Sequence, residues 1–275
     1  YFSDGDIAIL HRFSLDYIDV LDPLDYSLKR QHALTTASGV SANAHSLYTA
    51  PDGRSYLTLY GAPEVQVHDL QAASGQSLID RIDLSQFADA DGTCEADLIF
   101  AIGDRVFVTV QRLDQGKGWS VAAPELLLEL DLTRHVVVDL DEQVDGVQGI
   151  EVPIRWARQW RRDPLSDDAV YLLGDQIARF DSASNTIEVV ADKAAMGQIG
   201  VESFLQPQSF VVEPDGNAVV ASYDADFEGV RLYRVKLDQG SSPPVIDELV
   251  GGFDAVERTL EIGDGELWFG STRAG

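Results

Sequence analysis

The stretch Asp52-Gly53-Arg54-Ser55-Tyr56-Leu57-Thr58-Leu59-Tyr60 decides the fold of this chain. An acidic residue and a glycine make a tight turn, and the following residues show the period-2 alternation that is typical of a half-buried β-strand. The turn recurs at intervals of about fifty residues, as Asp4-Gly5, Asp52-Gly53, Gly103-Asp104, Asp167-Asp168, Asp215-Gly216 and Asp264-Gly265. A period of this length, with strands in every unit, indicates a radial or stacked array of repeats.

Each repeat is predicted to contain four antiparallel strands. One repeat places them at 44–50, 54–60, 64–70 and 78–84. The three repeats that follow place them at 96–102, 105–111, 125–131 and 135–140, then at 154–161, 169–173, 176–181 and 186–191, then at 208–213, 218–223, 231–237 and 245–250. Four antiparallel strands joined by short Gly/Asp turns are the composition of a β-propeller blade. We therefore predict an all-β fold, with residues 1–275 forming a single β-propeller domain.

The two chain ends bear on the number of blades. The N-terminus supplies strands two to four of a blade, at 6–11, 17–21 and 30–34, and the C-terminus supplies two strands, at 258–262 and 266–270. Six blades fit the period best, and seven fit if a C-terminal piece is missing. We expect the N- and C-terminal strands to pair and close the ring, because closure removes the exposed sheet edge.

The third strands of the repeats end in a similar apolar-x-Asp step. The steps are Val20-Leu21-Asp22, Val67-His68-Asp69, Glu129-Leu130-Asp131, Arg179-Phe180-Asp181 and Val235-Lys236-Leu237-Asp238. With these repeats the chain resembles the bacterial propellers of the YVTN or WD-repeat-like type, which occur in surface-layer and periplasmic or lipoprotein-anchored proteins. The segments 87–92, 103–108 and 111–114 resemble the best-marked stretch of the lipoprotein group.

This resemblance implies a propeller outside the cytoplasm, in the periplasm or at the cell surface. The protein would reach that location through a signal peptide that is not in this sequence, and a lipid anchor would also lie outside it. Such propellers bind diverse ligands and partners, so the resemblance implies no single activity.

The charge of the chain excludes some partners. It has 46 acidic residues against 20 basic ones, a net charge of −26. Such a field repels nucleic acid and anionic membrane surfaces. No run of about 18 apolar residues exists, so we expect no transmembrane segment. Only four lysines are present, which is typical of a high-salt setting, although a solvated surface kept soluble by its charge gives the same composition.

A loop from a predicted fourth strand to a first strand, Asp89-x-Asp91-Gly92-x-x-Glu95, is the candidate metal site. Clustered carboxylates beside a glycine that permits a sharp turn are suited to a hard cation such as Ca²⁺. We name Asp89, Asp91 and Glu95 as its ligands. The alternative is a surface turn in a protein rich in acids.

The long loop 111–119, between a second and a third strand, is the first candidate for ligand binding. Loops of this type and those from fourth to first strands open on one face of a propeller, and unusually long loops are often functional. Trp119 is predicted either to cover a pocket there or to pack onto the neighbouring blade.

The Arg- and Trp-rich segment 154–162 is the second candidate. As part of a first strand, it would place Trp156, Arg158 and Trp160 on one face. Arg158 would then meet an anion in the channel, with support from the tryptophans. The alternative is a set of salt bridges between blades.

Alignment of the repeats gives a third candidate, a ring of basic and aromatic residues near the ends of second strands. Its members are Arg12, Tyr60, Arg112, Tyr223 and Arg273. Arginine and tyrosine are enriched in recognition surfaces, so the ring would attract an anionic or aromatic ligand. Tyrosines at the edge of any propeller would look the same.

The sequence contains no motif that assigns a catalytic reaction. G-x-S-x-G, H-E-x-x-H and P-loop patterns are missing, and the histidines lack metal-ligand spacing. His45 opens a first strand and is expected to stabilise a turn, the alternative being that it faces the channel. We predict a monomeric propeller that binds a small molecule or a protein partner and does not catalyse a reaction. The alternatives are a metal-dependent propeller hydrolase of the lactonase type and a purely structural surface protein.

Overall fold

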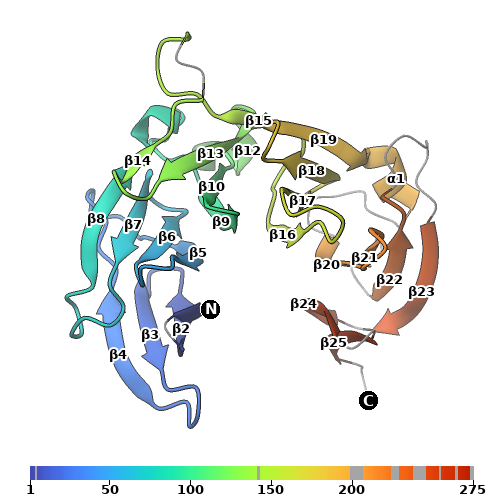
Figure 1. Cartoon of the computed structure of the whole chain (residues 1–275), viewed down its shortest axis with the longest axis horizontal. Coiled ribbons are helices and arrows are strands. Elements are labelled where there is room, and N and C mark those ends of the chain that lie inside the picture. Colours follow the sequence, from blue (N-terminus) through green and yellow to red (C-terminus); the bar gives the residue numbers. More distant parts are fainter. Residues whose placement is uncertain are drawn as a thin grey trace. The chain divides into compact units, whose positions relative to one another are not determined.

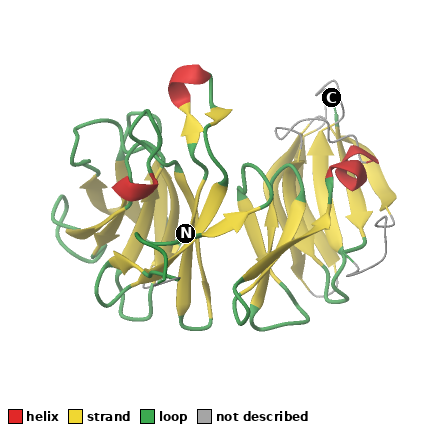
Figure 2. Cartoon of the chain, turned by 90° about the horizontal axis from the view of Figure 1, so that it is seen from above, coloured by secondary structure: helices red, strands yellow, loops and turns green. Residues whose placement is uncertain are grey.

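A computed structural model shows a chain built mainly from antiparallel β-strands (Figures 1 and 2). It describes all residues except 4, 141–142, 199–206, 224–228, 238–245, 254, 264–265 and 273–275. Helix in this described part is limited to η1 (Ser85–Phe87), η2 (Gln115–Lys117) and α1 (Lys193–Gln198), and none of the three has the length and apolar character needed to cross a membrane. The chain divides into two compact units, Tyr1–Glu151 and Val152–Gly275.

Three large sheets form most of the first unit. The strands of the first sheet are β1 (Phe2–Ser3), β2 (Asp6–His11), β3 (Tyr17–Leu21) and β4 (Leu28–Ala33). The second sheet contains β5 (Ala44–Thr49), β6 (Ser55–Leu59), β7 (Glu64–His68) and β8 (Leu78–Asp83). The third contains β9 (Ala96–Ile102), β10 (Arg105–Val110), β13 (Glu125–Asp131), β14 (Val136–Val137) and β15 (Ile150–Val152). A separate two-stranded ribbon pairs β11 (Leu113–Asp114) with β12 (Ser120–Val121).

The second unit repeats the same arrangement. Its first sheet contains β16 (Gln159–Arg162), β17 (Ala169–Leu173), β18 (Ile177–Asp181) and β19 (Thr186–Ala191). Its next sheet contains β20 (Pro207–Val212), β21 (Ala218–Tyr223), β22 (Val230–Val235) and β23 (Ile246–Phe253). The last described pair is β24 (Ala255–Gly263) with β25 (Glu266–Thr272). The prediction of an all-β chain of antiparallel sheets is confirmed, and four of the described sheets have the predicted four strands. The blade number, the single domain and the closure of the ring stay predictions.

Local chemistry explains why the turns recur. The aspartates that end the third strands accept a hydrogen bond from the backbone N–H two residues later: Asp22 Oδ1 from Leu24 at 2.9 Å and Asp69 Oδ1 from Gln71 at 2.9 Å. Aspartate in this role starts a turn without help from other segments. Gly53 in the acidic-glycine turn has φ of +86°, a conformation that favours glycine.

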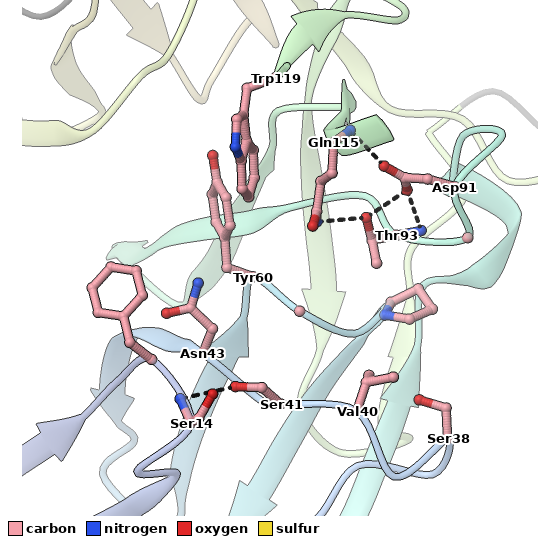
Figure 3. A pocket seen from close by; sticks show the side chains of 14 residues that line it. Ser14, Ser38, Val40, Ser41, Asn43, Tyr60, Asp91, Thr93, Gln115 and Trp119 are labelled. Atoms are coloured by element: carbon pink, nitrogen blue, oxygen red, sulfur yellow. Dashed lines mark hydrogen bonds between the residues drawn. The ribbon is translucent and has the colours of Figure 1, made fainter. Parts of the chain in front are cut away.

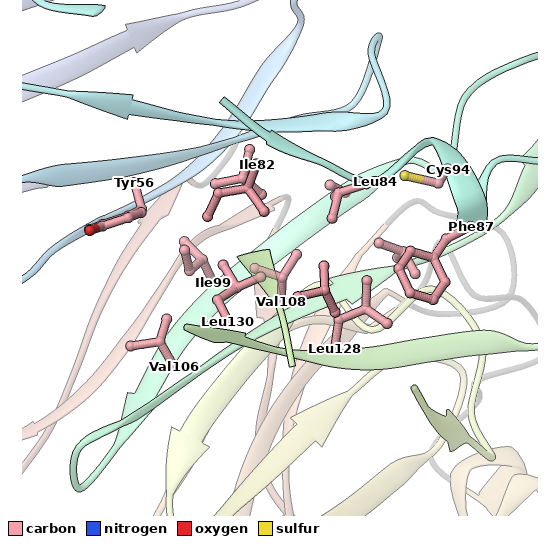
Figure 4. Close-up of a cluster of buried hydrophobic side chains, with 14 of the residues drawn as sticks. Tyr56, Ile82, Leu84, Phe87, Cys94, Ile99, Val106, Val108, Leu128 and Leu130 are labelled. Carbon is pink, nitrogen blue, oxygen red and sulfur yellow. The ribbon is translucent and has the colours of Figure 1, made fainter. Parts of the chain in front are cut away.

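In the four-stranded sheets that end with β4, β8 and β19, the second and third strands are more buried than the fourth. All residues of β6, β7 and β17 are buried, whereas most of β4, β8 and β19 is accessible to solvent. The cores lie between facing sheets, where side chains from neighbouring repeats interdigitate. Figure 4 shows one such core, in which residues such as Tyr56 and Ile82 of the second sheet meet Val108 and Leu128 of the third.

Three strand predictions are wrong in detail. The predicted strand 154–161 begins only at Gln159, because Trp156 has φ of 53° and breaks the extended backbone, so Trp156, Arg158 and Trp160 do not share the face of one strand. The strand predicted over 135–140 is reduced to Val136–Val137. The N-terminal sheet has its own first strand, β1, which the sequence did not reveal.

Candidate ligand-binding site

A pocket of about 680 Å³ opens in the first unit where loops from its three large sheets meet (Figure 3). The lining residues come from β2–β3, β4–β5, β6–β7, β8–β9 and the β10–β13 connection. These are the two loop classes that join second to third strands and fourth to first strands. The volume lies within the range of sites for small molecules, about 300–1,000 Å³.

Aromatic side chains form one wall of this pocket. The rings of Tyr60 and Trp119 lie 5.7 Å apart between centroids with a tilt of 32° (Figure 3). Trp119 is 44% exposed and Phe13 is 75% exposed. Large aromatic rings that remain accessible around a concavity are typical of a binding surface, because soluble proteins rarely expose a contiguous apolar patch without a binding function.

Strained backbone gathers around the same pocket. Phe13, Ser14, Asn43 and Trp119 line it, and each has a positive φ, of 54°, 68°, 42° and 64° respectively. A residue with a side chain in this region costs about 1–3 kcal/mol and persists only where surrounding contacts impose it. For Trp119, the ribbon supplies these contacts: its N–H donates to the Asp114 carbonyl at 3.0 Å, and Asp114 Oδ1 accepts the Lys117 N–H at 3.0 Å.

A chain of hydrogen bonds supports the aromatic wall from behind. The Tyr60 ring stacks on the His45 ring, with centroids 4.1 Å apart and an interplanar angle of 10°. The Tyr60 hydroxyl donates to Gln111 Oε1 at 2.7 Å, and Gln111 Nε2 donates to Asp97 Oδ2 at 2.7 Å. Burial, together with the charges of Asp97 and Glu95, raises the pKa of Tyr60, so its phenol stays neutral and able to donate.

His45 connects this chain to the first sheet. Its Nδ1 lies 2.9 Å from Asp97 Oδ1, which places the ring proton on Nδ1 because a carboxylate only accepts. The other nitrogen, Nε2, then accepts from Arg12 Nη2, while Arg12 Nε donates to Asn43 Oδ1 at 3.2 Å. The chain therefore runs from Arg12 to Tyr60 and links all three large sheets of the unit.

Two β-bulges position the polar residues of the chain. On β5 the pairing register with β6 shifts between Ala44 and Leu47, and His45 lies in this bulge. On β9 the register with β10 shifts between Ala96 and Ile99, the partners of Val110 and Val108, and Asp97 lies in that bulge. A threonine of the next strand holds each bulge: Thr58 Oγ1 accepts the Ser46 N–H at 2.9 Å, and Thr109 Oγ1 accepts the Leu98 N–H at 3.0 Å. Bulges re-aim side chains and are common beside functional sites.

The acidic loop predicted to bind calcium forms another side of the pocket. Asp89 Oδ1 accepts the Asp91 N–H at 3.0 Å, and Asp91 Oδ2 accepts the Gln115 N–H at 2.7 Å. Glu95 is fully buried, and its Oε2 accepts the Leu113 N–H at 2.7 Å. Burial raises the pKa of Glu95, which the hydrogen bonds from its neighbours oppose.

These contacts fit a metal ion poorly at Asp91 and Glu95, because N–H and hydroxyl donors already occupy the oxygens of both carboxylates, whereas Asp89 Oδ2 is buried and has no hydrogen-bond partner among the described residues. The part of the chain that the structure describes contains no group of three or more His, Cys, Asp or Glu side chains arranged for a metal ion. Calcium binding by Asp89, Asp91 and Glu95 stays a prediction.

The structure brings only some of the predicted ligand residues together. Arg12, Tyr60 and Trp119 belong to one site in the first unit. Arg112 lies at the base of the ribbon, where its Nη1 donates to the Pro124 carbonyl at 3.4 Å. The residue that corresponds to Tyr60 in the third sheet is instead Gln111: the N–H of Tyr60 donates to the Asn43 carbonyl, and the N–H of Gln111 donates to the carbonyl of Glu95.

The remaining candidates fall elsewhere. Trp156, Arg158 and Tyr223 belong to the second unit, and Arg273 lies outside the described residues.

Sequence reasoning missed Asn43, His45 and Asp97 as site residues, although a signal for them exists. Asn43-Ala44-His45, Glu95-Ala96-Asp97 and Trp156-Ala157-Arg158 share one pattern: a residue with positive φ, a buried alanine and a polar residue. Alignment of the repeats on that alanine would have found the polar positions at the start of the first strands.

Comparison with known proteins identifies the fold and no family. No family profile matches the chain, and no curated protein matches it significantly in sequence. Virginiamycin B lyase from Staphylococcus aureus is similar in structure, with a TM-score of 0.59 and 13% identity over 98% of this chain and 75% of the lyase chain.

Two further solved structures are comparable. A streptogramin B lyase has a TM-score of 0.55 and 14% identity over 97% of this chain and 72% of its own. A luciferin-regenerating enzyme has a TM-score of 0.55 and 12% identity over 98% of this chain and 84% of its own. These neighbours are β-propeller-type folds, and at such low identity the likeness shows the fold alone.

Proposed function

We propose that this protein is a binding propeller that holds a small organic molecule in the pocket of its first unit. The observation that carries the proposal is the aromatic wall of Tyr60 and Trp119, which is fixed from behind by the hydrogen-bond chain from Arg12 through His45, Asp97 and Gln111. A wall fixed before the ligand arrives loses little conformational entropy on binding, and this favours affinity.

The polar groups of the pocket support the same function. Asn43, Asp91 and Gln115 bring amide and carboxylate groups to a pocket that is otherwise lined by aromatic, aliphatic and small residues. A few fixed polar groups within a mainly apolar concavity orient a ligand and provide specificity.

Binding is better supported than catalysis because the imidazole nearest the pocket is already engaged on both sides. His45 Nδ1 donates to Asp97, and its Nε2 accepts from Arg12, so neither nitrogen is directed at a ligand. A general base must reach the proton that it removes. A hydrolase of the lactonase type would also need acids and amides converging on a cation, and the described residues contain no group of three or more His, Cys, Asp or Glu side chains that could hold one.

The proposal includes a finer classification and a location. We place the chain among propellers of the YVTN or WD-repeat-like type, with six four-stranded blades closed by the chain ends, acting as a monomer outside the cytoplasm. Support comes from the fifty-residue repeat and from the resemblance of segments 87–92, 103–108 and 111–114. Cell fractionation tests the location, and sedimentation tests the monomer.

A thermal-shift screen of small aromatic compounds tests the binding function. A ligand of the pocket should raise the melting temperature of the wild type, because it binds only the folded state, and Trp119→Ala should remove that rise. Tyr26→Ala is the matched control, since Tyr26 is an aromatic residue at a turn between β3 and β4, is 69% exposed and is not among the lining residues. Ligands whose effect survives Trp119→Ala unchanged would contradict the proposal.

A further inference from the structure

We propose that the molecule held by this pocket is an organic cation with a flat ring system. This inference rests on the proposed function and adds the chemical class of the ligand. Two properties of the pocket carry it: Asp91 is the charged residue among the described lining residues, and the accessible ring of Trp119 lies beside Tyr60 in the same lining.

The lining of the pocket is acidic. Among the described residues that line it, Asp91 alone carries a charge. Two further acids contact lining residues or their partners. Glu95 accepts a hydrogen bond from the lining residue Gln115, and Asp97 accepts one from Gln111, which in turn accepts from the Tyr60 hydroxyl. Arg12 is the basic residue of the site; its guanidinium donates to His45 and Asn43 and lies over the Phe13 ring, 4.8 Å from the ring centroid. In the described lining itself, an anionic ligand would therefore meet the carboxylate of Asp91 and no basic side chain.

Asp91 is held as an accessible carboxylate. Its Oδ1 accepts from the Thr93 N–H at 3.0 Å and from the Thr93 hydroxyl at 2.7 Å, and its Oδ2 accepts from Gln115 N–H at 2.7 Å. Asp91 is exposed to solvent and lines the pocket, so its charge attracts a cationic ligand through space, without a direct hydrogen bond.

The aromatic rings favour the same charge. Trp119 and Tyr60 line the pocket, and the electron-rich face of an aromatic ring attracts a cation within about 6 Å of its centroid. Phe13 lines the pocket as well, but the Arg12 guanidinium already lies over its ring. Trp119 is the most exposed tryptophan among those whose side chains the structure describes, so a flat ring can stack on it without displacing other side chains. The volume of about 680 Å³ suits a small molecule rather than a folded partner.

Two probes of similar size and opposite charge test this inference by calorimetry. N-Methylquinolinium is a flat two-ring cation, and 2-naphthoate is a flat two-ring anion. At low ionic strength we expect the cation to bind about tenfold more tightly than the anion, and we expect this preference to decrease as salt is added.

Substitutions locate the effect. Asp91→Asn should weaken binding of the cation about tenfold. Asp52→Asn is the matched control: Asp52 accepts the Arg54 N–H in the same type of turn, at 3.0 Å, and the substitution changes the net charge equally but lies outside the lining. Trp119→Ala should weaken both probes, and melting curves of every variant show whether it is folded.

The outcomes separate this inference from the function on which it rests. Equal affinity for the two probes, tighter binding of the anion, or equal effects of Asp91→Asn and Asp52→Asn would overturn the cation while leaving a ligand pocket. If Trp119→Ala leaves the affinity for both probes unchanged, the probes do not bind in this pocket, and the proposed function itself is wrong. If Lys-rich peptides bind more tightly than the small cation, the ligand is a basic protein segment and the inference of a small organic cation is wrong.

Discussion

Asp97 is the acceptor on which the hydrogen bonds behind the aromatic wall converge. It is 9% exposed and accepts from His45 Nδ1 at 2.9 Å and from Gln111 Nε2 at 2.7 Å. Asp97→Asn keeps the shape of the side chain but replaces one of its two acceptor oxygens by an NH₂ donor. That donor would face either His45 Nδ1–H or Gln111 Nε2–H, which are donors themselves. We expect the free energy of unfolding in urea to fall by about 1–3 kcal/mol. Ligand binding should weaken as well, because Tyr60 loses its fixed position.

An exposed aspartate provides the comparison for this substitution. Asp52→Asn removes the same charge at a residue whose side chain is 54% exposed, and it should change the free energy of unfolding by less than about 0.5 kcal/mol. Equal effects of the two substitutions would show that Asp97 acts only through the net charge of the chain.

His68 makes stability depend on pH. It is 1% exposed, with Nδ1 2.9 Å from Ser77 Oγ and Nε2 3.0 Å from Gln66 Oε1, and burial lowers its pKa to about 4. In the unfolded chain His68 titrates near its ordinary pKa of about 6.5, so below that pH the unfolded state binds a proton that the folded state rejects. Stability is therefore lost as pH falls from about 6.5 to about 4, by up to roughly 1.4 kcal/mol per pH unit.

Urea titrations at several pH values check this dependence. His68→Gln removes the titrating group, so the difference in unfolding free energy between wild type and variant should be constant above pH 7 and shrink below it. A difference that stays constant down to pH 4.5 would show that His68 does not carry the effect.

At the scale of the elements, the bulge on β5 is held by a single hydroxyl. Thr58 Oγ1 accepts the Ser46 N–H at 2.9 Å and donates to the Asp97 carbonyl of the next sheet at 2.6 Å. Thr58→Val preserves the shape of the side chain but leaves a buried N–H without its acceptor. We expect a loss of about 1–3 kcal/mol in urea unfolding. Thr58→Ser keeps the hydroxyl and should restore most of it; an equal loss in both variants would point to packing instead.

The loop between β8 and β9 allows two outcomes for added calcium. If Asp89, Asp91 and Glu95 bind Ca²⁺, millimolar Ca²⁺ raises the melting temperature of the wild type and not that of Asp91→Ala. If these carboxylates serve only as acceptors for hydrogen bonds within the chain, the melting temperature does not change. The hydrogen bonds of Asp91 and Glu95 favour the second outcome, and Mg²⁺ at the same ionic strength is the control.

The elements were more predictable from sequence than the site. Strands such as Ala96–Ile102, Glu125–Asp131 and Ala169–Leu173 agree with prediction at both ends, because alternation and turn residues are local signals. The site depends on signals that alternation does not contain. The bulge on β5 removes His45 from the two-residue alternation of its strand. The positive φ of Trp156 interrupts a segment whose sequence predicts a continuous strand.

At the scale of the whole molecule, ion pairs within the sheets use many of the few basic residues. Arg105 pairs with Glu129 at 2.6 Å, Arg179 with Asp163 at 2.8 Å and Arg234 with Glu213 at 2.6 Å. The first pair joins the neighbouring strands β10 and β13, and the other two connect β18 and β22 to the residues that follow β16 and β20. The pairs leave the excess of acids unneutralised, since the chain has 46 acidic and 20 basic residues. The compact state therefore bears a repulsion that the unfolded chain relieves by expanding.

Salt should reduce this repulsion and stabilise the fold. The screening length falls from about 10 Å at 0.1 M to about 3 Å at 1 M, which is shorter than most distances between surface charges. We expect the melting temperature to rise as NaCl increases from 0.05 M into the molar range. Sodium sulfate stabilises proteins by exclusion as well, so matching curves for the two salts at equal ionic strength would identify screening as the cause. A flat response to NaCl would instead mean that the acidic surface serves solubility alone.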